Sequence, residues 1–100
     1  MIVLRRELGE ALREERQAQG RSLREVAKAA SVSTAYLSEV ERGTKEASSE
    51  LIASICGALG RPLSEVLTDV TSRVQRAEEA TAPVALHERR RAVSARDAAA

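Results

Sequence analysis

The chain has 100 residues, 43% of them hydrophobic, and its 16 basic and 15 acidic side chains give a net charge of +1. This length suits one small domain, and the near balance of charge excludes nucleic-acid binding through bulk positive charge alone. With Tyr36 as the only aromatic residue, the core must be built from aliphatic side chains. Because the helix formers Ala, Leu, Arg and Glu dominate, we expect an all-α fold.

The cysteine content and the hydropathy of the chain indicate the cellular compartment in which it works. The single cysteine, Cys56, cannot form an internal disulfide, which fits a reducing cytoplasm. The first four residues are followed at once by charged ones, unlike a signal peptide. No apolar run approaches the roughly 20 residues that span a bilayer. We therefore expect a cytoplasmic protein with no membrane partner.

Residues 1–43 contain three predicted helices. Apolar residues recur at helical spacing over 3–19, and Gly20 is a natural stop. Ser22 and Glu25 then have the spacing of a capping box that opens a second helix. A turn at residues 30–32 leads to a third helix, capped by Ser33 and ended by Gly43. Two short helices joined by a tight turn over residues 22–43 are typical of a DNA-binding helix-turn-helix, whose second helix enters the major groove.

Two further helices follow. Ser48 caps a fourth, which Gly60 ends, and Pro62 suits the first turn of a fifth. The fifth helix keeps its apolar spacing to about residue 79, beyond what a small domain needs. We expect a DNA-binding domain over 1–69, a helix extension for dimerisation over 70–80, and a flexible tail over 81–100. The expected dimer interface comprises Leu63, Leu67, Val70, Val74 and Ala77.

The strings SLREVA (22–27) and YLSEVERG (36–43), with Leu8-Gly9 and Leu12-Arg13, resemble the Cro/CI/Xre-type helix-turn-helix family. This resemblance covers residues 8–67 and implies a five-helix, lambda-repressor-like fold. The first two strings and KEASSEL (45–51) also resemble actinobacterial activators of Clp protease genes. Ser31 departs from the family, which often has Gly at this turn position, so we expect the turn geometry to differ slightly.

The resemblance assigns the DNA-contacting residues. Base edges would meet the exposed half of the third helix, through Thr34, Ala35, Ser38 and Glu39. Phosphates would be bound by Arg21, Arg24, Ser33, Arg42 and Lys45, which fix register without reading sequence. The simpler interpretation is that Ser33 only caps the helix and that the cations form an ordinary solvated surface. Because the base readers are short, we expect dimer spacing and DNA shape to supply much of the specificity.

The family also pairs an arginine of the first helix with the glutamate of the Glu-Arg-Gly stretch, here Arg16 with Glu41. Such a pair would serve architecture rather than recognition. Cys56 is expected to be an inert buried thiol. His87 has no partners for a metal site, so we expect no metal and no cofactor. No nucleophile–base pair or phosphate loop is present, and an enzyme is not expected.

Partners follow from these assignments. They are double-stranded DNA, a second copy of the chain, and, for an activator, RNA polymerase, with Glu41, Glu46 and Glu50 as candidate contacts. The C-terminal Ala98, Ala99 and Ala100 form a candidate degradation tag for Clp protease, although an unstructured end without function is the commoner case. Two alternatives stay open: an antitoxin that represses its own genes, and a protein-interaction module built on a retired helix-turn-helix.

Overall fold

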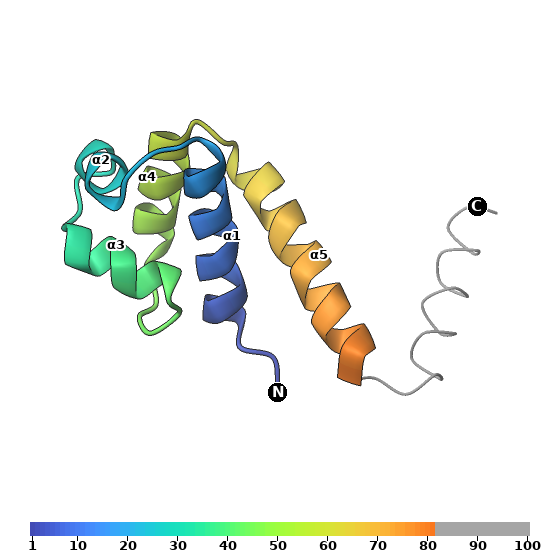
Figure 1. Ribbon diagram of the computed structural model, residues 1–100. Coiled ribbons are helices and arrows are strands. Elements are labelled where there is room, and N and C mark those ends of the chain that lie inside the picture. The colour runs from blue at the N-terminus through green and yellow to red at the C-terminus, as the bar shows by residue number, and fades with distance from the viewer. Residues whose placement is uncertain (82–100) are drawn as a thin grey trace.

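The computed structural model describes residues 1–81, which form five helices and no strand (Figure 1). The helices are α1 (Leu4–Ala18), α2 (Leu23–Ala29), α3 (Thr34–Glu41), α4 (Ser49–Leu59) and α5 (Leu63–Thr81). The all-α, five-helix expectation is therefore confirmed, with helix bounds within about two residues of those predicted. Of the expected tail over 81–100, residue 81 is the last of α5, and residues 82–100 lie outside the described residues.

Serine side chains set where three of the helices begin. The hydroxyls of Ser22, Ser33 and Ser48 accept hydrogen bonds from the backbone N–H three residues later, at 3.1, 3.0 and 3.3 Å. At Ser22 the Glu25 carboxylate also accepts from the Ser22 backbone N–H, which completes the capping box. These hydrogen bonds lower the pKa of the Glu25 carboxyl, so the box is strongest when Glu25 is charged.

The core is aliphatic and lies where α1, α2, α3 and α4 meet. Its largest fully buried side chains are Leu12, Val26, Leu37, Val40 and Ile55. Cys56 is buried beside them, and burial raises the pKa of its thiol, which keeps the group protonated and unreactive.

Close approach of α1 and α3 depends on Gly9. A Cβ at this position would lie 2.3 Å from the carbonyl oxygen of Val40. Near the end of α3, Gly43 has a φ of +73°, and a Cβ there would lie 2.6 Å from the Cα of Arg6. Both glycines therefore let the backbone of α3 and its following turn rest directly on α1.

The turn between α2 and α3 has the left-handed geometry that glycine usually supplies. Ser31 has a φ of 59° and is the one non-glycine residue with positive φ among residues 1–81. The expectation that serine would alter the turn is wrong in this respect, because Ser31 adopts the left-handed conformation itself, at a cost in strain.

Helix α5 runs antiparallel to α1, on the side opposite α3 (Figure 1). Val66 and Val70 are buried, at 2% and 5% exposure. Val70, which belongs to the expected helix extension for dimerisation, therefore packs within its own chain. No single helix within residues 1–81 has the length and apolar composition to cross a membrane, although α4 and α5 together, bent by 102°, would suffice on those two criteria alone.

Candidate nucleic-acid interface

Helix α3 presents a polar side to solvent. Leu37 and Val40 anchor it in the core at 0% and 2% exposure. Thr34 and Ala35 are exposed on its first turn, while Ser38 and Glu39 are half-buried. Of the four predicted base readers, Thr34 and Ala35 therefore start the helix, whereas Ser38 and Glu39 lie in its second half and are only partly exposed. Their side chains are short, so they can touch base edges only when the helix backbone lies deep in a groove.

Two basic side chains, Arg42 and Lys45, contact the predicted base-reading residues. The Arg42 guanidinium donates to the Ser38 hydroxyl at 2.7 Å. The Lys45 ammonium lies 3.4 Å from the Glu39 carboxylate and 5.9 Å from the centre of the Tyr36 ring. Glu39 would repel DNA phosphates if it were alone. Lys45 offsets that charge, although the pair is exposed and weak.

The predicted phosphate contacts divide into two groups. Ser33, Arg42 and Lys45 lie at the two ends of α3, and Arg24 is exposed in the first turn of α2. Arg21 is different, because its guanidinium donates to the Ala58 carbonyl at 2.6 Å. Its side chain thus satisfies a backbone carbonyl in the last turn of α4. A phosphate contact by Arg21 stays a prediction, because the other guanidinium N–H groups remain to be used.

Arg16 and Glu41 form a two-pronged ion pair between α1 and α3. The Arg16 Nε and Nη2 atoms lie 2.8 and 3.0 Å from the two Glu41 carboxylate oxygens. Glu41 is buried, at 6% exposure, which removes it from the candidate contacts for RNA polymerase. The hydrogen bond with Glu41 raises the pKa of Arg16, so the pair stays charged. It fixes the orientation of α3 on α1.

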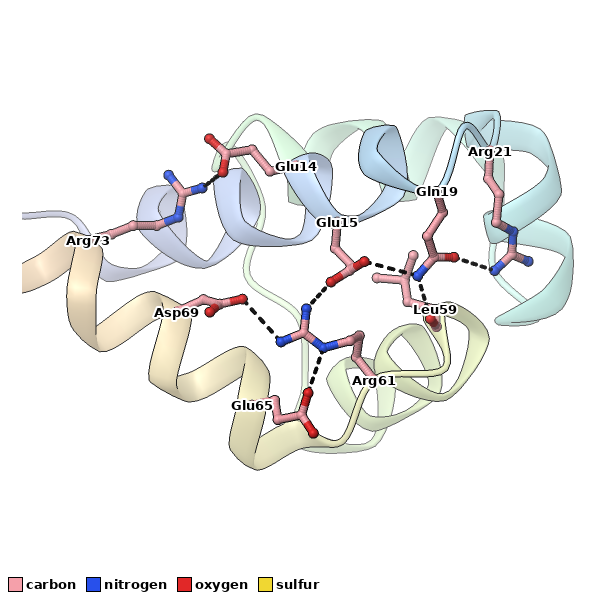
Figure 2. Close-up of polar contacts among 9 residues, drawn as sticks. All are labelled: Glu14, Glu15, Gln19, Arg21, Leu59, Arg61, Glu65, Asp69 and Arg73. Atoms are coloured by element: carbon pink, nitrogen blue, oxygen red, sulfur yellow. Dashed lines mark hydrogen bonds and ion pairs between the residues drawn. The ribbon is translucent and has the colours of Figure 1, made fainter.

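A polar network joins α1 to the end of α4 and to α5 (Figure 2). Arg61, between α4 and α5, binds Glu15 of α1 as well as Glu65 and Asp69 of α5, the last two at 3.0 and 3.4 Å. Farther along α5, Arg73 binds Glu14 and lies 3.4 Å from Glu10. Sequence reasoning missed these pairs. No local spacing relates Glu15 to Arg61, whereas Arg61 and Glu65 are four residues apart, a spacing that could have indicated their pair.

The residues expected at a dimer interface do not share one environment. Leu63 and Leu67 are 42% and 49% exposed, one turn apart on α5. Val74 and Ala77 are half-buried. Val70 is buried in its own chain at 5% exposure, so its side chain cannot contact a second copy. The exposed candidates reduce to Leu63 and Leu67.

Three further predictions concern a metal site, the degradation tag and His87. Within residues 1–81 no group of three or more His, Cys, Asp or Glu side chains could hold a metal ion. The candidate degradation tag and His87 lie outside the described residues.

Two short helices joined by a tight turn, the second solvent-exposed and flanked by cations, define a DNA-binding protein of the helix-turn-helix class. The helix-turn-helix family model matches residues 12–66, and the chain belongs to this family, in its Xre-type branch of transcription regulators.

Named relatives agree with this assignment. The chain is 54% identical over 76 residues to the transcriptional regulator ClgR of Mycobacterium tuberculosis, a match that spans 76% of this chain and 68% of that one. A crystal structure of the clp gene regulator ClgR from Corynebacterium glutamicum superposes with a TM-score of 0.72 at 50% identity, covering 78% of this chain and 85% of that one. The restriction-modification controller protein C.AhdI of Aeromonas hydrophila superposes with a TM-score of 0.61 at 31% identity, over 62% and 94% of the two chains.

Proposed function

We propose that the chain regulates Clp protease genes as an activator, binding a palindromic operator as a dimer. The observation that carries this proposal is the exposed polar side of α3, joined to 54% identity with ClgR. The similar protein from Corynebacterium glutamicum is a clp gene regulator. The reading helix and its flanking cations are the parts of such a regulator that contact DNA.

Two features support dimerisation: the spacing of half-sites in a palindromic operator and the exposed leucines of α5. Two copies of α3 must be about 34 Å apart to enter successive major grooves on one face of the duplex. Leu63 and Leu67 offer exposed apolar side chains on α5, the helix that lies across α1 from α3 (Figure 1). Glu46 and Glu50 are exposed close to the DNA-facing end and are candidate contacts for RNA polymerase in an activator. Such a regulator acts in the cytoplasm, on the chromosome.

The test is a fluorescence anisotropy titration with a labelled duplex from upstream of a clp gene of the same genome, beside a shuffled duplex. We expect the natural duplex to bind more tightly. A Thr34→Ala, Ser38→Ala double variant should reduce that preference, because it removes base-edge hydrogen bonds, and should keep the part that comes from dimer spacing and DNA shape. The matched control is Ser54→Ala, an exposed serine on α4. Equal affinity of the wild type for both duplexes would contradict the proposal.

A further inference from the structure

A polar hollow lies beside the exposed side of α3, where α1, α2 and α3 meet. It has a volume of about 230 Å³ and is lined by Arg13, Arg16, Leu23, Ser38, Glu41 and Arg42. We call it the Arg13 hollow. Ser38 is both a lining residue and a predicted base reader, so the hollow is continuous with the DNA-facing surface. Any ligand in it would lie next to a duplex held by α3.

The charges around the Arg13 hollow favour an anion. Arg16 and Glu41 neutralise each other in their buried pair. One guanidinium nitrogen of Arg42 donates to the Ser38 hydroxyl. This bond holds the Arg42 guanidinium along α3, on the lining of the hollow. Arg13 is exposed and has no hydrogen bond or ion pair within residues 1–81. Two positive charges, Arg13 and Arg42, are therefore left on the lining.

The carboxylates that neighbour Arg13 on α1 are bound by α5. Glu10 lies three residues before Arg13, a spacing at which a helical carboxylate can reach an arginine. The guanidinium of Arg73, however, lies 3.4 Å from Glu10 and also binds Glu14 (Figure 2 shows the Glu14 contact). The nearest carboxylates on α1 are thus engaged by α5, and the guanidinium of Arg13 stays available to a ligand.

We infer that the Arg13 hollow holds one phosphate of the DNA backbone between Arg13 and Arg42 when α3 enters the major groove. This inference rests on the proposed DNA-binding function and adds a helix α1 residue to the interface. A phosphate fits because arginine binds its oxygens through paired N–H donors. Such a contact positions the duplex and reads no sequence.

The experiment measures affinity for the clp upstream duplex and for the shuffled duplex. Arg13→Ala should weaken binding about tenfold per protomer on both duplexes, the lower end of what one hydrogen bond between charged groups contributes. The loss should shrink as salt is raised, because salt screens the contact. The control is Arg76→Ala, which removes the same charge from α5. Among residues 1–81, the Arg76 side chain bonds only its own helix, at the Ser72 carbonyl, 3.5 Å away.

A double variant tests whether the two arginines share one phosphate. If they do, Arg13→Ala with Arg42→Ala should lose less affinity than the product of the two single losses. The inference is overturned if Arg13→Ala and Arg76→Ala agree within about twofold, or if the double loss is the full product. Either result leaves the proposed function intact, provided that the wild type still prefers the clp duplex. Circular dichroism melts confirm that each variant is folded.

Discussion

At the residue scale, Glu41 is the one charged side chain that is buried among residues 1–81, and both of its oxygens are bound by Arg16. Removing Arg16 would leave a carboxylate without its counter-charge in the core. Arg16→Ala should therefore cost about 3–5 kcal/mol of unfolding free energy. Arg13→Ala, one turn earlier on the same helix and exposed, should stay within about 0.5 kcal/mol. Urea unfolding measures both, and equal losses would show that the pair contributes nothing.

Ser31 gives a second prediction at this scale. Its φ of 59° is strained for serine and unstrained for glycine. Ser31→Gly should raise stability by about 0.5–1 kcal/mol, since the relief of strain exceeds the added entropy of the unfolded chain. Ser54→Gly, in the middle of α4, should instead lower it by about 0.5 kcal/mol. Thermal melts of the two variants should shift in opposite directions, and a loss of stability at Ser31 would contradict the strained turn.

At the element scale, two glycines inside helices should respond in opposite ways to the same change. A Cβ at Gly9 meets the backbone of Val40, whereas a Cβ at Gly57 on α4 meets nothing within 4 Å. Gly9→Ala should cost about 2–3 kcal/mol by forcing α3 away from α1. Gly57→Ala should add about 0.5–1 kcal/mol through helix propensity. Chemical denaturation separates the two, and a neutral Gly9→Ala would mean that α3 does not rest on α1.

The positions of the helices were easier to predict from the sequence than the contacts between residues far apart in the chain. The starts of α2, α3 and α4 follow from serine caps, and a cap is a local signal within three residues. The orientation of Arg21 was not predictable, because its acceptor, the Ala58 carbonyl, is 37 residues away. Burial of Val70 depends likewise on the angle at which α5 returns along α1. The base readers were located through the family motif, since their own chemistry is common to any exposed helix.

At the scale of the whole molecule, α5 has one side on α1 and another side in solvent. Leu67 is 49% exposed there, and Leu4 on α1 is 63% exposed. We expect a dimer in solution, and Leu67→Glu should convert it to a monomer by placing a charge in the apolar contact. Leu4→Glu is the matched control and should leave the dimer intact. Size-exclusion chromatography with light scattering gives the mass, and a Leu67→Glu dimer would rule out this interface.

The central claim is that two copies of α3 enter successive major grooves of one operator. Hydroxyl-radical footprinting of the wild type on the clp upstream duplex tests it most directly. We expect two protected patches on one face of the duplex, separated by about one helical turn, or roughly 10 base pairs. A single patch, or uniform protection with no defined position, would contradict it.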